Sequence, residues 1–183
     1  MTENHADRPA ESSSKPAPKQ VPVWEDLLIL LMKIGMILLA GFLVFTFVYG
    51  IVRVSNMEMS PAVKDGDLVI YYRIGKNYIQ SDLVAVEVDG KVIIGRVVAQ
   101  QGDTVDITAD GLLVNGSLQQ ETDIQGETLP NEEGITFPVT LKEGEVFLLA
   151  DNREGAEDSR IFGPVRISDT LGKVMTIIRT RHL

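Results

Sequence analysis

The sequence contains no cysteine, which excludes disulfide bonds and every metal site that needs a thiolate. Histidine is scarce too: His5 and His182 lie near the two ends with no third ligand residue nearby, so no metal or other cofactor is expected. Positive charge is also in short supply. Residues 54–183 carry 12 Lys and Arg against 21 Asp and Glu, which accounts for the whole net charge of −9. This acidic balance argues against nucleic-acid binding, because phosphate contacts need a cationic surface.

Large apolar side chains are almost absent from residues 1–20, which are rich in Ser, Pro, Lys and Glu. Such a segment cannot bury enough surface to offset the entropy of ordering, so it is expected to be disordered. The composition then reverses, and Ile34 to Val52 is a run of 19 residues without a charge. A bilayer core requires about 20 apolar helical residues, and Tyr49–Arg53 contains no small-residue cleavage site. The pattern predicts an uncleaved transmembrane anchor with Trp24 and Tyr49 at its interfaces.

The charges that flank this run give its orientation. Lys15, Lys19 and Lys33 precede the main apolar stretch, whereas Arg53 and Lys64 follow it, so the positive-inside rule favours a cytoplasmic N terminus. The expected organisation is a disordered cytoplasmic tail and helix start at 1–26, a transmembrane signal anchor at 27–53, and an extracytoplasmic β domain at 54–183. The protein is expected to be a single-pass plasma-membrane protein.

Beyond residue 54 the apolar residues come in short runs typical of strands, and no stretch keeps a helical period. Asp89-Gly90 and Asp110-Gly111 separate pairs of such runs, which predicts hairpins, and Asn115-Gly116 marks a further turn. The expected fold is mostly β, a compact antiparallel domain behind one N-terminal transmembrane helix. Strands are expected at Leu68–Tyr72, Leu83–Val88, Lys91–Ala99, Val105–Ile107, Leu112–Val114, Val146–Leu149 and Lys173–Arg179, with an irregular excursion at 117–136.

Five short motifs follow the apolar run in a fixed order. The first, Glu58-Met59-Ser60-Pro61 with Gly66-Asp67, resembles the nucleophile box of the type I signal peptidases, Ser-Met-x-Pro followed by Gly-Asp. The resemblance spans residues 54–179 and implies a signal-peptidase-I-like β domain. The other four boxes are Ile94–Asp103, Ala150–Arg153, Asp158–Gly163 and Leu171–Val174.

The same resemblance identifies the chemical groups that this chain lacks. The family attacks a peptide with a serine, removes the serine proton with a lysine, and orients that lysine with a second serine. The corresponding positions here are Glu58, Gly95 and Ala156. A carboxylate cannot form the ester that a serine forms in acyl transfer, and glycine has no side chain to accept a proton. No catalytic residue is therefore expected, and the chain is interpreted as a protease scaffold without its chemistry.

Two alternatives stay open. Ser60 lies on the same face as Glu58 if the segment is extended, so an active signal peptidase that removes signal peptides could use Ser60 as a relocated nucleophile, with Lys91 the nearest candidate base before Gly95. The other alternative is a membrane-tethered structural module that uses its β domain only to oligomerise.

The remaining boxes suggest binding and structural roles. The old cleft is expected to bind an extended peptide by strand addition, with Glu58 receiving a basic or amide-bearing partner. Met57, Met59 and Tyr72 form an apolar set for which lipid docking, peptide binding and simple core packing all remain open. Alternating Asp and Arg predict an ion network that pins strands together. The cleft residues are Asn56, Met57, Glu58, Met59, Ser60 and Pro61, and the network residues are Asp151, Asn152, Arg153, Asp158, Ser159 and Arg160.

An acidic residue at the serine position and a glycine at the lysine position also match a narrower group. The chain resembles the signal-peptidase-like proteins that Gram-positive bacteria need for sortase-driven pilus assembly. This resemblance implies a non-proteolytic accessory or chaperone at the outer membrane face. The implied partners are the membrane and either pilin subunits or a pilin-type sortase.

Overall fold

A computed structural model describes residues 23–180, so most of the expected disordered tail lies outside the described residues. Helix α1 spans Val23–Val48 and is the one helix in this part of the chain that is long and apolar enough to cross a membrane. Its length of roughly 39 Å, at 1.5 Å per residue, exceeds the bilayer core of about 30 Å. Glu25 and Asp26 lie in the first turn, where acidic side chains stabilise the positive end of the helix dipole. These properties suit a membrane anchor.

The expected transmembrane range 27–53 runs past the end of this helix. Residues Tyr49–Arg53 form strand β1, which pairs in antiparallel register with β2 (Leu68–Tyr72). An uncharged run does not distinguish a helix from a buried strand, and the sequence Tyr-Gly-Ile-Val-Arg is rich in strand formers. Gly50 permits the pairing, because a Cβ at this position would overlap the ring of Tyr71 on β2.

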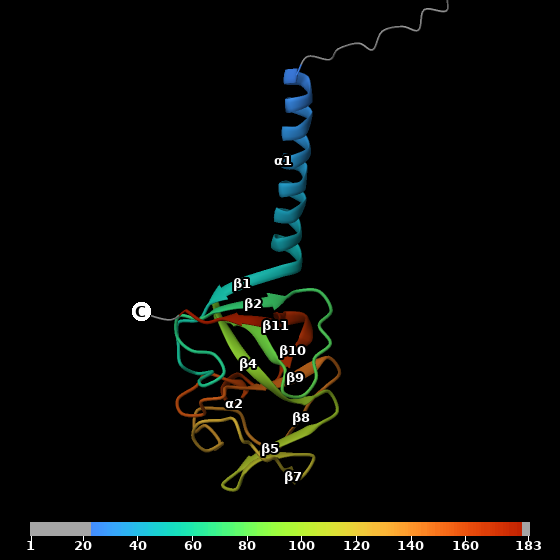
Figure 1. The fold of residues 1–183 in the computed structure, drawn as a ribbon. Coiled ribbons are helices and arrows are strands. Elements are labelled where there is room, and N and C mark those ends of the chain that lie inside the picture. The colour runs from blue at the N-terminus through green and yellow to red at the C-terminus, as the bar shows by residue number, and fades with distance from the viewer. Residues whose placement is uncertain (1–22, 181–183) are drawn as a thin grey trace, which may run out of the picture. The chain divides into compact units, whose positions relative to one another are not determined.

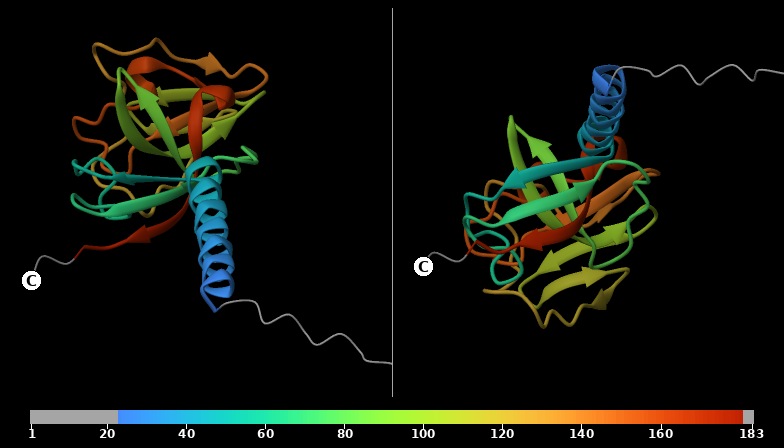
Figure 2. Two further views of the ribbon diagram at one scale, coloured as in Figure 1. Left: turned by 90° about the horizontal axis from the view of Figure 1, so that it is seen from above. Right: turned by 45° about the horizontal axis from the view of Figure 1, so that its top comes forward.

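The β domain consists of two antiparallel sheets (Figure 1). The larger sheet has the order β1-β2-β11-β3-β4-β9-β10 and the smaller has the order β7-β6-β5-β8. The C-terminal strand β11 lies between β2 and β3, so the two ends of the domain's chain meet in one sheet (Figure 2). The further strands are β3 (Leu83–Val88), β4 (Lys91–Gln100), β5 (Thr104–Thr108), β6 (Gly111–Val114), β7 (Ser117–Leu118), β8 (Val139–Thr140), β9 (Glu145–Leu149), β10 (Val165–Arg166) and β11 (Thr170–Ile178).

The expected fold class, mostly β with one N-terminal apolar helix, is confirmed. The two turns at Asp89-Gly90 and Asn115-Gly116 have positive φ at all four residues, as two-residue hairpin turns require. The sequence did not reveal β7, β8 and β10, which have two residues each, or the single-turn helices α2 (Ser159–Phe162) and η1 (Ile167–Asp169). Elements this short have no periodicity to detect.

Three clusters of buried apolar side chains support the domain. The cluster behind the Glu58 segment includes Met59, Ile94 and Ala156. A second cluster lies around Val84 and Leu148, and the third joins the smaller sheet to β4 and β9. Residues adjacent to the predicted site positions are therefore anchored in the core, which fixes the backbone of the site.

Candidate functional site

The segment Asn56–Pro61 forms a turn rather than an extended strand. The N–H of Ser60 donates to the carbonyl of Met57 at 3.0 Å, and the N–H of Val63 donates to the carbonyl of Met59 at 2.8 Å. The extended geometry that would place Ser60 beside Glu58 is therefore wrong. Met57 is exposed and Glu58 half-buried, whereas Met59 and Ser60 are buried, with Ser60 only 6% exposed. Met59 belongs to the core, and the apolar set expected with Met57 and Tyr72 does not form one face.

Glu58 is held by its neighbours in the turn. The Asn56 side-chain amide donates to one Glu58 carboxylate oxygen at 2.9 Å, while the backbone N–H of Glu58 donates to the Asn56 side-chain oxygen at 3.4 Å. Partial burial raises the pKa of the Glu58 carboxyl. A hydrogen bond from the backbone of Glu157 lowers this pKa, and the negative charge of Glu157 raises it. The site therefore presents an oriented carboxyl that favours a cationic or hydrogen-donating partner.

Two of the sequence boxes meet at this turn. The backbone N–H of Asn152 donates to the carbonyl of Glu58 at 2.7 Å, and the Asn152 side-chain amide lies 3.5 Å from the carbonyl of Met57. The segment after β9 therefore fixes the position of the Glu58 turn. The sequence grouped Asn152 with the ion network, but the structure places it against the cleft segment.

Gly95, at the expected general-base position, lies buried in β4 against β9. A Cβ added to Gly95 would lie 2.9 Å from the Cβ of Leu148, closer than real Cβ atoms approach one another. Gly95 has no positive φ, so the close strand packing and not the backbone conformation calls for glycine here. A side chain at Gly95 would therefore require the backbone of β4 or β9 to shift.

Ala156, at the expected base-orienting position, is also buried. It is only 1% exposed and belongs to the same apolar cluster as Met59 and Ile94. A serine hydroxyl here would need a hydrogen-bond partner in an apolar environment, at a cost of roughly 1–3 kcal/mol if none were found. The surroundings of Ala156 are therefore those of a packing residue.

The network residues form ion pairs, and Arg160 connects two of them because it also donates to the backbone carbonyl of Arg153 at 2.8 Å. Asp151 is fully buried and receives two hydrogen bonds from Arg96, at 2.7 and 2.5 Å. Asp158 caps α2 and pairs with Arg160 at 2.9 Å, and the Ser159 hydroxyl accepts from the backbone N–H of Leu148 at 3.0 Å. Burial of these charges requires such pairing, and it ties β4, β9 and α2 together.

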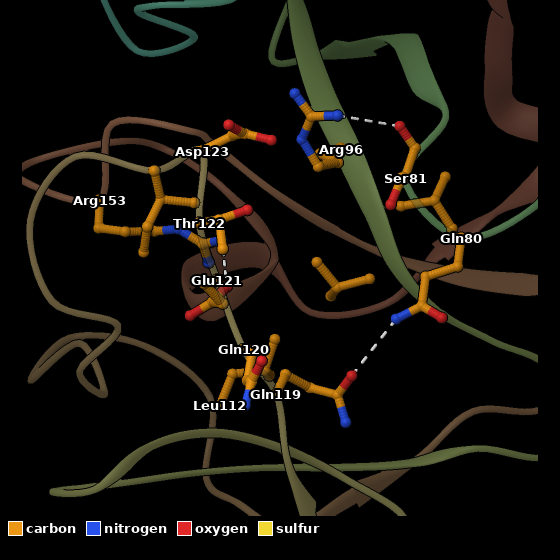
Figure 3. Close-up of a pocket in the computed structure, with 13 residues that line it drawn as sticks. Gln80, Ser81, Arg96, Leu112, Gln119, Gln120, Glu121, Thr122, Asp123 and Arg153 are labelled. Carbon is orange, nitrogen blue, oxygen red and sulfur yellow. Dashed lines mark hydrogen bonds and ion pairs between the residues drawn. The ribbon is translucent and has the colours of Figure 1, made fainter.

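Arg153 pairs with a residue that no sequence pattern indicated. Its guanidinium lies 2.6 Å from the carboxylate of Glu121, a residue of the irregular segment after β7 (Figure 3). Arg96 and Glu121 are thus two structural partners missing from the predicted network. Arg96 sits in the quoted box beside Gly95, but pairing across strands has no local sequence signal.

The first half of β4 has an open edge near the site. β3 pairs with Lys91–Arg96, whereas β9 pairs only from Arg96 onward. Val97 exchanges backbone hydrogen bonds with Ser81 and Asp82 on the β3 side, so strand alternation turns the backbone groups of Val92 and Ile94 toward the other edge. Among the described residues no backbone partner occupies that edge. An extended peptide could add there as a strand.

Within residues 23–180, no group of three His, Cys, Asp or Glu side chains is placed to hold a metal ion. His5 and His182 lie outside these residues. The groups at the Glu58 turn are a half-buried carboxyl, the Asn56 amide and the edge of β4.

An apolar helix followed by a β domain with these ordered boxes defines a scaffold of the signal peptidase type. Residues 27–179 match the family described as "Signal peptidase, peptidase S26", and the chain belongs to this family.

Two curated relatives and one solved structure are similar to the chain. The chain is 27% identical to signal peptidase IB of Staphylococcus aureus over 174 residues, which cover 82% of this chain and 88% of that one. It is 31% identical to a probable chloroplast thylakoidal processing peptidase of Arabidopsis thaliana over 133 residues, 66% of this chain but only 35% of the plant protein. A crystal structure of a signal peptidase I from Enterococcus faecalis matches with a TM-score of 0.43 and 25% identity, over 55% of this chain and 97% of that one.

Proposed function

We propose that this chain is a non-proteolytic member of the signal peptidase family that binds an extended peptide at the Glu58 turn. The observation that carries the proposal is the closure of the base position. Acyl transfer by a Ser–Lys dyad requires a lysine in hydrogen-bond reach of a nucleophile. Gly95 has no side chain, and a Cβ there would lie 2.9 Å from the Leu148 Cβ, so the strands would have to shift to admit one. Glu58 cannot replace the serine, because a carboxylate has no hydroxyl group that could form the acyl ester intermediate.

Binding without cleavage is supported by what the site retains. The open edge of β4 offers main-chain hydrogen bonds to an extended segment, and Glu58 offers a carboxylate to a lysine or amide side chain of that segment. The peptide would be released uncut, since no covalent intermediate can form.

The biological setting rests on resemblance. We infer an accessory or chaperone role in sortase-dependent pilus assembly, with pilin subunits or a pilin-type sortase as partners. In this proposal α1 is the anchor, the N terminus is cytoplasmic and the β domain lies on the outer face of the plasma membrane.

Cleavage of a membrane-embedded preprotein by the purified full-length protein tests the absence of proteolysis. An active signal peptidase serves as the positive control, and the native chain is expected to leave the preprotein intact. The double variant Glu58→Ser with Gly95→Lys places a serine and a lysine at the two dyad positions of the aligned boxes. We expect this variant to stay inactive, because a side chain at Gly95 would contact Leu148 too closely. The native chain is therefore the informative arm, and cleavage at the signal-peptide site would overturn the proposal.

Peptide binding is tested with two matched extended peptides that carry either lysine or norleucine at one position, taken from a pilin sequence. The lysine peptide is expected to bind roughly two- to fivefold more tightly, since half-exposed ion pairs contribute about 1 kcal/mol or less. Glu58→Gln should remove that difference, whereas Glu87→Gln on the exposed face of β3 should leave it unchanged. Equal binding of the two peptides to the native protein would count against a role for Glu58.

The second candidate is an active signal peptidase, which the names of the relatives favour. Ser60 would be its nucleophile, but Ser60 is buried in the turn, and the Lys91 side chain is 73% exposed and paired with Glu157. Loss of any observed cleavage on Ser60→Ala, with retained folding, would establish this function.

A further inference from the structure

Strand β1 lies at one end of the larger sheet (Figure 1), and it differs from the strands at the other sheet ends. Those strands are β10, β7 and β8, which have two residues each. Very short edge strands protect a sheet from pairing with another chain, and so do prolines and lysines on the edge. β1 has five residues, Tyr-Gly-Ile-Val-Arg, with no proline and a charge only at its end. Within residues 23–180 it is the one sheet-end strand that lacks this protection.

Three residues of β1 turn their backbone groups away from β2. The N–H of Val54, just after the strand, donates to the carbonyl of Asp67 at 2.9 Å, on the β2 side. Strand alternation then directs the N–H and C=O groups of Tyr49, Ile51 and Arg53 to the open edge. In the described part of the chain, no hydrogen bond reaches the outward groups of Ile51 and Arg53. Both residues are exposed, and Ile51 is 58% exposed, so a second strand can reach these groups.

The side chains at this end of the sheet favour a second copy of the same chain as the occupant of the edge. Strands β1, β2 and β11 contain Arg53 and Lys173 but no Asp or Glu, so the net negative charge, which opposes association, lies elsewhere in the domain. In an antiparallel pair centred on Ile51, this residue lies opposite its own copy, and Tyr49 lies opposite Arg53. No like charges then face each other, and a guanidinium can pack on a tyrosine ring.

We propose that two copies of this chain pair through their β1 strands, in antiparallel register, and form one continuous sheet. The two Ile51 residues exchange a pair of main-chain hydrogen bonds, and Tyr49 and Arg53 extend the ladder on each side. The Tyr49 carbonyl already accepts from the Arg73 side chain at 3.2 Å, but a carbonyl oxygen has a second lone pair for the new strand. The proposal does not depend on the function proposed for the Glu58 turn.

The membrane anchor suits this pairing in two ways. The two-fold axis of an antiparallel strand pair is perpendicular to the sheet, so both α1 helices leave the joined sheet on the same side, as two copies in one membrane require. A pair of five-residue strands is also small beside the roughly 1,200–2,000 Å² of a stable interface. Pairing is therefore expected between copies anchored in one membrane, where the effective concentration of the strands is high.

Cysteine cross-linking of the full-length protein in phosphatidylcholine vesicles tests the pairing, and the native chain has no cysteine to give a background. Ile51→Cys places two thiols opposite each other at a Cα separation of about 5.5 Å, within the range of a disulfide. Met175→Cys on β11 is the matched control. Met175 is 59% exposed but lies two strands further in, about 24 Å or more from its own copy.

A mixture of Tyr49→Cys and Arg53→Cys proteins tests the register. The mixture should form a disulfide dimer, whereas each protein alone should not, because its two thiols lie about 14 Å apart along the pair. Adding Ile51→Pro to both proteins removes two outward N–H groups and no bond between β1 and β2, so it should lower the yield roughly tenfold. Circular dichroism confirms that this variant is folded.

Oxidation by copper phenanthroline should link Ile51→Cys roughly tenfold faster than Met175→Cys, because pairing raises the effective concentration of the Ile51→Cys thiols. Equal rates would show random collisions, and a mixture that links no better than its separate components would exclude the register; either result overturns the proposal. An Ile51→Cys protein that stays monomeric also overturns it. A water-soluble maleimide then shows what the edge does instead, since a reactive thiol means a free edge and a protected thiol means an edge covered by lipid.

Discussion

Replacement of Gly95 by alanine tests the closure of the base position most directly. The added Cβ would lie 2.9 Å from the Leu148 Cβ, and both atoms belong to strands of the core rather than to flexible side-chain ends. Overpacking of this kind costs about 1–3 kcal/mol of unfolding free energy. For a domain of this size the corresponding fall in the melting temperature is roughly 3 to 15 °C. Gly95 has no positive φ, so backbone strain does not contribute to the loss.

The contact can be assigned by a double-mutant cycle followed by circular dichroism of the full-length protein in detergent. Leu148→Ala keeps the Cβ, so most of the cost of Gly95→Ala should remain on top of the cost of about 2–5 kcal/mol of the truncation itself. Leu148→Gly removes the Cβ and should make the cost of Gly95→Ala smaller. Gly41→Ala in α1 is the control, because a Cβ added there would meet no atom within 4 Å outside the backbone of its own helix. A neutral Gly95→Ala would refute the reasoning, because the position would then have room for a lysine side chain.

The other predictions concern the charged groups of the domain. The pKa of Glu58 is raised in the folded protein, so the folded state binds this proton more tightly and the unfolding free energy should fall as pH rises from about 4.5 through the folded pKa. Denaturant melts across this range should show the loss in the native protein and not in Glu58→Gln. Asp151→Asn leaves Arg96 without its buried partner and should cost about 3 kcal/mol or more, measured by urea unfolding. Glu157→Gln, which removes the exposed 3.9 Å pair with Lys91, should change stability by about 0.5 kcal/mol or less; equal effects of the two variants would contradict the burial argument.

The sequence was sufficient to predict the longer strands after residue 67 and the turns at Asp89-Gly90 and Asn115-Gly116, because these depend on local composition, whereas the turn predicted at Asp110-Gly111 lies one residue earlier. Asp89-Gly90 adopts the positive φ values that its residue types favour, and the apolar runs on either side of it become β3 and β4. The end of the membrane helix was not predictable in the same way. Tyr49–Arg53 continues the apolar run, and it becomes a strand because β2, about 20 residues later, provides the hydrogen-bonding partner.

The site positions are a prediction of the aligned boxes, which point to Glu58, Gly95 and Ala156. The alignment could not show that a Cβ at Gly95 would crowd Leu148 or that a turn buries Ser60. Both facts depend on contacts between segments far apart in the chain. The pairing of Arg153 with Glu121 has the same origin, since Glu121 lies in a segment without regular structure.

The three positions that the aligned boxes assign to the Ser–Lys mechanism differ in a way that supports the proposed peptide binding. At Gly95 and Ala156, on the side of the base, the space is filled with apolar packing from Leu148 and Met59. At Glu58, on the side of the nucleophile, the group is polar, half-buried and oriented by two hydrogen bonds to Asn56. A lysine base must be buried and neutral to work, and such a group would be costly to keep once it had no catalytic role. A half-exposed carboxyl beside an open strand edge has no such cost, and it can still recognise a peptide.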